Sequence, residues 1–273
     1  MSKLHHENVI TNFDIGIRFY ESLVRNNGYV PFHWHSSIEI VGVISGRLTF
    51  MFNGKEQIVN PQQFIVVPSG VVHAVENIPN QSLVLQVPLK FIENYYPHPE
   101  NINFEITKCY SKAYKQIFGL LLKINSLVKQ GYKGYLFDLG VIILLIMKEL
   151  ILNFTDDTNP LLQSTSSLKE IIVYINEHYV EHLSVNILAN KFGYNSSYLS
   201  RIFKQQTGIT IIQYIYRLRL ASLYQDLLSS NISIKQLMDK NGLTNQRTAR
   251  NLFKNMYGKL PLQIRQDKIL QSK

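Results

Sequence analysis

The stretch SYLSRIFKQQTG, residues 197–208, decides how the C-terminal part of the chain folds, because its pattern returns as RTARNLFKNMYG at residues 247–258. Phe203 aligns with Phe253 and Gly208 with Gly258, at an offset of 50 residues. Each copy follows a short helical segment and a turn that contains glycine. The repeat predicts two helix-turn-helix units.

Polar residues with capping chemistry mark where the helices of this repeat begin. Ser184 and Ser233 precede the first helix of each unit, and Ser233 is followed by Gln236, the spacing of a capping box. Residues 210–230 predict one long helix between the units, with Thr210 as its cap. This helix would hold the two second helices at a fixed separation.

The second helix of each unit has an apolar and a polar side. Apolar residues recur at helical spacing on the side that we expect to face inward. They are Leu199, Ile202, Phe203, Ala249, Leu252 and Phe253. The opposite sides contain no acidic residue and consist of Ser196, Ser197, Ser200, Arg201, Lys204, Gln246, Arg247, Arg250, Asn251 and Lys254. Such faces fit a DNA major groove, where arginine reads guanine, amides read adenine and lysine meets phosphate.

Net charge divides the chain into two unlike parts. Residues 1–164 carry 13 basic and 13 acidic side chains, whereas residues 165–273 carry 15 and 6, so the whole net charge of +9 lies in the repeat region. A neutral part joined to a strongly basic one predicts a polyanion-binding module tethered to a second domain. The length of 273 residues also favours two domains.

Short strand-like runs separated by turn residues fill residues 29–88. The runs are VGVISG, LTFMFNG, EQIVN, FIVVPSG and SLVLQVP, and Asn53-Gly54 is a strong hairpin signal. This spacing predicts a β-barrel or jelly roll. From about residue 107 the period becomes helical, with a second apolar helix over about 135–152.

The segment PFHWHSSIEI, residues 31–40, gathers ionisable side chains within this strand region. In a strand His33 and His35 would point to the same face, because successive side chains alternate. Glu39 follows four residues after His35, and the later run PSGVVHAVEN, residues 68–77, adds His73. Imidazole and carboxylate groups in this pattern fit a metal centre or the wall of a ligand pocket.

These two runs resemble the motifs of the cupin family, with Gln62 standing where the second motif usually begins with glycine. The resemblance implies metal ligands at His33, His35, Glu39 and His73, a set that suits divalent iron, manganese, zinc or nickel. Cupin-like sensor domains also use these positions without metal, where they would bind an effector together with Trp34. Alternatively, the histidines are satisfied structural groups inside the barrel.

Residues 168–266 resemble the DNA-binding domain of AraC/XylS-family transcription regulators. The matching signatures are LANKFGYNSSYLSRIFKQQTG (188–208), YRLRLA (216–221) and LFKNMYGKLPLQIR (252–265). Family members commonly carry Tyr-Phe-Ser-Arg in the second recognition helix, where this sequence has Thr248, Ala249, Arg250 and Asn251. The second unit would therefore contact DNA with a shifted set of side chains, or bind it weakly while the first unit does most of the reading.

The resemblance implies a sequence-specific transcription regulator that responds to a small molecule, with sugars and related metabolites as the family's usual effectors. We expect no enzymatic activity. The alternative is a cupin metalloenzyme, of isomerase or dioxygenase type, fused to a DNA-binding module, and a third reading is a constitutive regulator whose barrel only dimerises. Expected partners are double-stranded DNA, the effector and a second copy of the chain, with RNA polymerase as a further candidate.

We expect an α+β multidomain chain: a cupin-like barrel over 1–106, a helical dimerisation region over 107–153, a linker over 154–167 and an all-α double helix-turn-helix domain over 168–273. The helical region carries more apolar surface than a small barrel needs, which favours a homodimer. The candidate interface residues are Leu120, Leu121, Ile124, Leu139, Ile143 and Ile146. Alternatively, these residues only cap the barrel.

Composition excludes several classes of protein. A single cysteine, Cys109, cannot form an intramolecular disulfide framework. The N-terminus does not read as a secretory signal, and the apolar run VIILLIM, residues 141–147, is too short to span a bilayer. We therefore expect a cytoplasmic protein without a membrane partner.

Overall fold

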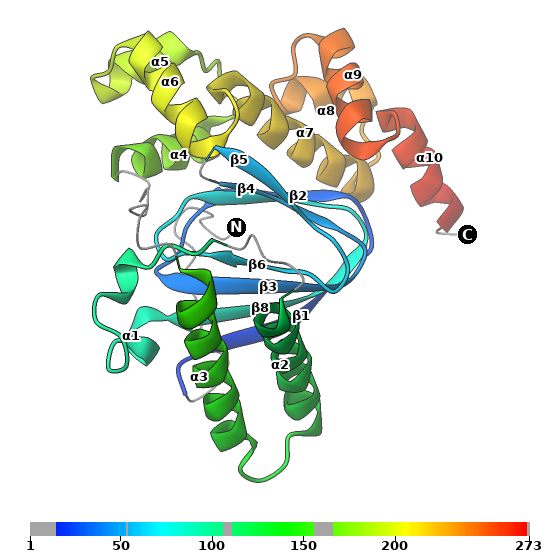
Figure 1. Ribbon diagram of the computed structural model, residues 1–273. Coiled ribbons are helices and arrows are strands. Elements are labelled where there is room, and N and C mark those ends of the chain that lie inside the picture. The colour runs from blue at the N-terminus through cyan, green and yellow to red at the C-terminus, as the bar shows by residue number, and fades with distance from the viewer. Residues whose placement is uncertain (1–14, 53, 106–110, 156–165, 272–273) are drawn as a thin grey trace.

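A computed structural model describes residues 15–52, 54–105, 111–155 and 166–271. Strands form a layered barrel at the centre, with helices α4 to α10 on one side and helices α2 and α3 on the other (Figure 1). No helix within these ranges is long and apolar enough to cross a membrane. The expected combination of a jelly-roll domain and a helical C-terminal domain is confirmed.

Eight strands form two four-stranded antiparallel sheets that face each other. The first sheet has the order β1 (Arg18–Val24), β8 (Asn80–Pro88), β3 (Ser37–Ser45) and β6 (Phe64–Val67). The second has the order β2 (Gly28–His33), β7 (His73–Asn77), β4 (Leu48–Phe52) and β5 (Lys55–Val59). Alternate residues of both sheets, among them Val41, Phe50 and Val75, point inward and form the core of the sandwich.

Helices α2 (Lys112–Gln130) and α3 (Tyr135–Phe154) cover the outer face of the first sheet. Strand β3 is buried along most of its length because both of its faces are covered, as its near-continuous apolar sequence requires. A side-chain carbon at Gly42 would lie 3.0 Å from the Leu121 Cδ1 atom, so glycine lets α2 approach β3 closely. The short α1 (Leu89–Ile92) and the 3-10 turn η1 (Pro99–Asn101) follow β8.

The candidate dimer residues lie in this packed layer. Leu121, Ile124, Leu139, Ile143 and Ile146 are fully buried in the core between the helices and the first sheet, and Leu120 packs against it. The selection of the five buried residues as interface residues was wrong, because helical period shows that a side of α2 or α3 is apolar but not that the barrel already covers it.

The C-terminal helices cover the outer face of the second sheet. The first helix-turn-helix unit contains α4 (Ser166–His178), α5 (Val185–Phe192), α6 (Ser196–Thr207) and the start of α7 (Ile211–Ser229). Its core is shared with three sheet residues and with the residue that precedes β7, namely Phe32, Met51, Ala74 and Val72. The second unit contains α8 (Ile234–Lys240), α9 (Gln246–Tyr257) and α10 (Pro261–Gln271), and the described members of its core all come from residues C-terminal to Ser166.

The predicted domain boundaries stay predictions. Most of the predicted linker over 154–167 lies outside the described residues, which resume at α4 with Ser166. Residues 106–110, around the predicted start of the helical region at 107, also lie outside them, and α2 begins at Lys112.

Candidate DNA-binding faces and the cupin histidine site

The first helix-turn-helix unit is shaped by caps at each helix end. The Ser184 side chain accepts a hydrogen bond from the Ile187 amide at the start of α5, as predicted. Helix α5 ends at Gly193, which adopts the left-handed conformation with φ 72°. Asn195 then caps α6 by accepting from the Ser197 and Tyr198 amides. The turn therefore fixes the direction in which α6 leaves the unit.

Helix α6 presents the predicted polar face to solvent. Leu199 and Phe203 are fully buried, and Ile202 is half-buried against the same core. The predicted contact residues of α6 are exposed or half-exposed, and they are Ser196, Ser197, Ser200, Arg201 and Lys204. The Arg201 guanidinium lies 5.6 Å from the Tyr198 ring centroid. The C-terminal end of α6 meets the barrel at the turn between β4 and β5, and the exposure of these five residues leaves the polar face open to DNA.

The second unit repeats this construction. Ser233 and Gln236 form the predicted capping box at the start of α8, and Asn245 caps α9. Ala249 and Phe253 are fully buried. The predicted contact residues of α9 are all exposed or half-exposed, and they are Gln246, Arg247, Arg250, Asn251 and Lys254.

Leu252 differs from the prediction that it faces inward, because 37% of it is exposed. Its counterpart at the 50-residue offset, Ile202, packs against the core that includes sheet residues of the N-terminal domain. The core of the second unit includes no such residues among those described. In the first unit the N-terminal domain contributes to the core that covers Ile202, whereas it contributes no described residue to the core beside Leu252.

Arg219 of α7 joins the two units, a role that the sequence did not reveal. Its guanidinium donates hydrogen bonds to the Tyr179 and Glu181 carbonyl oxygens, each at 2.6 Å, and to the Gly242 carbonyl oxygen at 2.8 Å. Tyr179 and Glu181 follow α4, whereas Gly242 lies between α8 and α9. Three bonds from one guanidinium fix the position of one unit relative to the other. The predicted capping box of α7, formed by Thr210 and Gln213, is also present.

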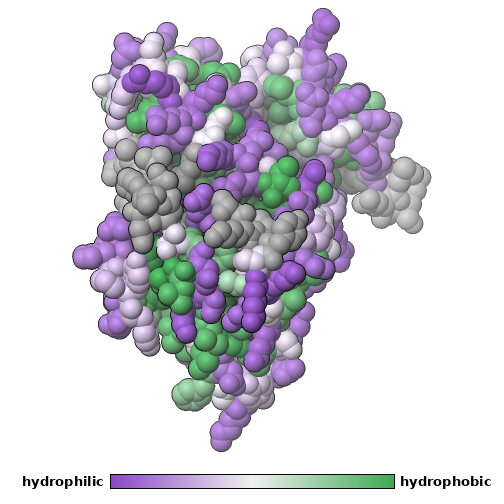
Figure 2. All heavy atoms as spheres, viewed as in Figure 1, coloured by the Kyte–Doolittle hydropathy of each residue, from purple (hydrophilic) through white to green (hydrophobic). Residues whose placement is uncertain are grey.

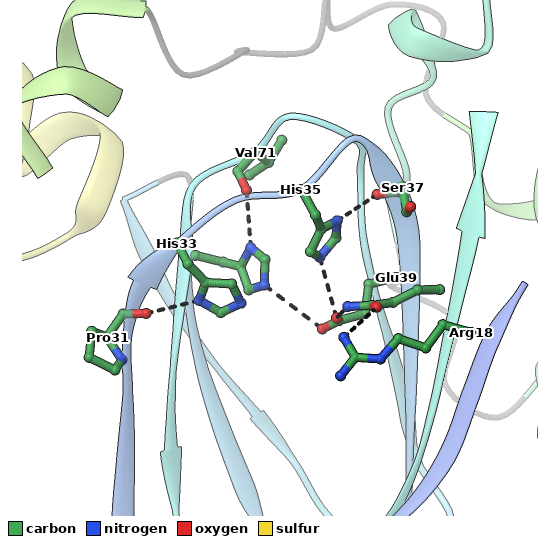
Figure 3. A network of polar contacts seen from close by, with 9 residues as sticks. Arg18, Pro31, His33, His35, Ser37, Glu39 and Val71 are labelled. Carbon is green, nitrogen blue, oxygen red and sulfur yellow. Dashed lines mark hydrogen bonds and ion pairs between the residues drawn. The ribbon is translucent and has the colours of Figure 1, made fainter. Parts of the chain in front are cut away.

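The cupin site lies inside the sandwich, where His33 and His73 face each other across a register pair of β2 and β7. The ligand atoms of His35, Glu39 and His73 all lie within 4.8 Å of one another. His35 Nε2 is 3.3 Å and His73 Nε2 is 3.8 Å from the Glu39 carboxylate (Figure 3). All three residues are buried, with exposed fractions of 1%, 6% and 0% in chain order.

Backbone carbonyls orient the imidazole rings. His35 Nδ1 lies 2.9 Å from the Ser37 carbonyl oxygen, and His73 Nδ1 lies 3.0 Å from that of Val71. A carbonyl oxygen can only accept, so each Nδ1 carries the proton and each Nε2 faces Glu39. Burial, and next the charge of His33, hold the pKa of His73 well below its usual value. At neutral pH the His73 Nε2 atom therefore carries an electron pair.

Burial raises the pKa of Glu39, but the hydrogen bond and the positive charge of His35 outweigh it, so the pKa of Glu39 lies below the usual value. The Gln86 amide also donates to the Glu39 carboxylate at 2.7 Å, and Arg18 donates to Gln86 at 3.1 Å. Sequence reasoning missed Gln86 and Arg18. The available signal was one glutamine in the apolar run SLVLQVP, which β-sheet register places directly opposite Glu39.

The donor set fits a divalent transition metal. An unprotonated histidine nitrogen and an ionised carboxylate converge with no hydrogen bond to His73 Nε2 among the described residues, an arrangement that a cation would stabilise. His35, Glu39 and His73 would hold it. His33 stands beside this trio, with its ring centroid 4.2 Å from that of His73 and 6.2 Å from that of His35.

Two further positions depart from the sequence expectations. Trp34 was placed among the effector-binding residues, but its ring packs against the core shared with the first helix-turn-helix unit, 5.6 Å from Lys169 Nζ. Alternation along the chain turns it away from its histidine neighbours. Gln62 adopts a left-handed backbone with φ 65°, which explains why glycine is usual at this motif position.

Comparison with known proteins supports both halves of this description. A helix-turn-helix domain model matches residues 188–267, and a cupin domain model matches residues 21–87. The HTH-type transcriptional regulator YdeC of Bacillus subtilis is 24% identical over 239 residues, which cover 81% of this chain and 82% of the relative. The HTH-type transcriptional activator RhaS of Shigella sonnei is 24% identical over 251 residues, covering 86% and 87%. A solved structure of an apo ToxT variant from Vibrio cholerae shares 12% identity and a TM-score of 0.41, covering 91% of this chain and 95% of that one.

A cupin domain joined to two helix-turn-helix units defines a DNA-binding transcription regulator. The relatives that match along most of the chain are transcription regulators, which favours this class over the cupin metalloenzyme. The chain therefore combines an AraC-type helix-turn-helix domain with a cupin domain, the combination that its sequence signatures indicated.

Proposed function

We propose that this regulator binds operator DNA through α6 and α9 and changes its DNA occupancy when a small molecule binds at His35, Glu39 and His73. The observation that carries the proposal is a set of ionisable groups buried in an apolar sandwich. Burying such groups costs stability, so their presence in a core supports a functional site over a packing solution. DNA binding would place the protein in the cytoplasm, with RNA polymerase as a further partner.

Sugars and related metabolites are the effector class that we propose. Imidazole and carboxylate groups can accept and donate hydrogen bonds to hydroxyls, and the surrounding apolar side chains would pack on carbon faces. A stacked contact with the His73 ring, with centroids 6.4 Å apart, supports Phe50 as the aromatic residue for this role.

A divalent metal at the same three residues is a second candidate. The convergence of His35 and His73 Nε2 atoms on the Glu39 carboxylate favours it. A bound cation would act as a Lewis acid toward an oxygen of the effector. In this version the protein would respond to the effector only when loaded with metal.

Replacing His35 or His73 with alanine is expected to abolish the transcriptional response. The affinity of the effector-free protein for DNA should stay nearly unchanged, because the DNA-contacting faces lie on other elements. A thermal-shift screen of sugars and small acids, repeated after chelation and with added zinc or manganese, would identify the inducer. Operator DNA recovered by selection from a random library would then drive a reporter gene with and without that inducer.

Induction, stability and bound metal, measured on the same two variants, distinguish a metal-dependent site, a metal-free effector site and structural histidines. A metal-dependent site predicts that chelation reproduces the alanine phenotype and that the variants lose bound metal. Structural histidines predict a loss of about 1–3 kcal/mol in stability without a specific effect on induction. Unchanged induction in both variants would remove the histidines from the sensing mechanism.

We also propose that α3 forms a homodimer contact, through different residues from those expected. Phe137, Val141, Leu145 and Leu152 are exposed by 84%, 58%, 38% and 68%, and they recur along one side of the helix. Figure 2 shows apolar residues gathered over the lower helices. An exposed apolar stripe of this kind is suited to a self-complementary contact.

Val141→Glu is expected to shift the full-length protein from dimer to monomer in sedimentation at tens of micromolar, because a charge would enter the apolar contact. Lys123→Glu, at an exposed position of α2, serves as the control for added negative charge. A monomeric wild-type protein at that concentration would contradict the dimer.

A further inference from the structure

The outer face of the second sheet is a docking surface for the first helix-turn-helix unit. The Asn176 side chain of α4 donates to the Phe32 carbonyl oxygen of β2 at 3.2 Å, and the Tyr214 hydroxyl of α7 donates to Asn176 at 2.5 Å. The Gly54 amide, in the turn between β4 and β5, donates to the Gln206 carbonyl oxygen at the end of α6 at 3.1 Å. Three helices of this unit are therefore tied to the sheet.

Arg217 of α7 lies at the centre of this surface and contacts all four strands of the sheet. Its guanidinium forms an ion pair with Glu76 of β7 at 2.7 Å and lies 3.8 Å from Glu56 of β5. It also lies 2.6 Å from the Met51 sulfur of β4 and 5.8 Å from the Tyr29 ring centroid of β2. We call these five residues the Arg217 junction.

The second helix-turn-helix unit packs on α7, the helix that carries Arg217. Tyr257, at the end of α9, is nearly fully buried and stacks on Tyr224 of α7 with ring centroids 4.4 Å apart. Burial raises the pKa of Tyr257, and the charges of Tyr224, Glu76 and Tyr29 raise it further. Helix α9 is thus linked to α7, and through α7 to Arg217.

Strand register places the junction directly behind the cupin site. On β7, His73 points into the sandwich whereas Ala74 and Glu76 point outward. His73 pairs with His33 and Glu76 pairs with Tyr29 across the same two strands. A movement of β7 at the histidines must therefore move the residues that hold Arg217, because both sets share one short backbone segment.

We propose that the outer face of the β2–β7–β4–β5 sheet transmits the state of the cupin site to the DNA-binding domain, with Arg217 as the residue that couples them. The proposal rests on the proposed sensing function for its biological meaning, but the physical coupling exists without an effector. Arg217 acts as a positioning residue: it sets how the first unit sits on the sheet.

The strength of the Arg217 contact suits a switch. The ion-pairing side chains of Arg217 and Glu76 are 23% and 37% exposed, and ion pairs of this kind contribute little net stability. A ligand with modest differential affinity for two arrangements could therefore make or break the contact. The planar guanidinium also reaches several partners at once, which a lysine ammonium cannot reproduce.

Amide hydrogen exchange of the full chain tests the coupling without effector or DNA. Arg217→Ala is expected to accelerate exchange about fivefold in α6 and α7 and also in β2 and β7 across the junction. Glu76→Gln should reproduce this pattern and Arg217→Lys should give part of it. Arg25→Ala, at an exposed arginine between β1 and β2, is the matched control and should leave these segments unchanged.

A second arm starts from the cupin site. His73→Gln, which keeps the position polar, is expected to change exchange in α6 and α7, and Arg217→Ala should abolish that change. The proposal is overturned if His73→Gln leaves α6 and α7 unaffected, or if its effect persists without Arg217. It is also overturned if Arg217→Ala accelerates exchange in α7 alone. Failure of the proposed sensing function would be seen in a different experiment, because induction would then be unchanged in the His35→Ala and His73→Ala variants.

Discussion

Replacing Arg201 with glutamate is expected to weaken operator binding by about 100-fold or more. Arg201 is exposed on the outer face of α6, with its neighbours Ser197, Ser200 and Lys204 on the same side. The change removes a base or phosphate contact, and it also turns a carboxylate toward the DNA backbone. Fluorescence anisotropy at one fixed salt concentration measures the loss, because affinities for DNA depend steeply on salt.

The matched control for Arg201→Glu is Arg25→Glu, which changes net charge equally on an exposed part of the N-terminal domain. A loss no larger than that of the control would contradict the role of α6. Arg250→Glu in the second unit shows whether α9 also reads DNA with its shifted residues. If both units bind, footprinting should protect two successive major grooves per subunit, roughly 34 Å apart.

Replacing Phe32 with alanine is expected to destabilise the full chain by about 3–5 kcal/mol. Phe32 is fully buried, although it lies on the outer face of the barrel, and its ring meets the Tyr214 ring edge-on with centroids 5.0 Å apart. The smaller side chain would leave a cavity between the sheet and α7. The same change should therefore also loosen the contact between the two domains.

Urea unfolding followed by tryptophan fluorescence measures this effect. Trp34 is the only tryptophan in the chain, and it lies beside Lys169 at the domain contact, so its emission reports on that contact. Leu23→Ala, at a residue of β1 that is 64% exposed, is the control and should cost less than about 0.5 kcal/mol. A loss below about 1 kcal/mol for Phe32→Ala would show that the domains do not share a core in solution.

The helical part of the fold was predictable because its determinants are local. Capping residues such as Ser184, Thr210 and Ser233 lie within three residues of the amides that they bind. The inward faces of α6 and α9 follow from helical period, with Leu252 as the exception. Helical period shows which side of a helix is apolar but not what covers that side, so the buried dimer candidates on α2 and α3 were misassigned.

The cupin site was predictable only in part. Two motifs identify His35, Glu39 and His73, and the structure brings these three together. Gln86 and Arg18 join the site through pairing between β1, β8 and β3, which depends on sheet register rather than on sequence spacing. Likewise, strand alternation shows that Phe32 and Glu76 point away from the histidines, but only the tertiary fold shows that Tyr214 and Arg217 meet them there.

The hydrogen bonds of Arg219 have a consequence for the DNA itself. The Arg219 guanidinium ties the end of α4 to the turn between α8 and α9. The distance and angle between α6 and α9 are therefore held nearly constant. One extra base pair between their contact regions would displace the second region by about 3.4 Å and rotate it about the helix axis. The protein has little freedom to follow, so the duplex would have to bend or untwist instead. The number of base pairs between the two contact regions therefore contributes to sequence specificity, although the protein does not contact those base pairs.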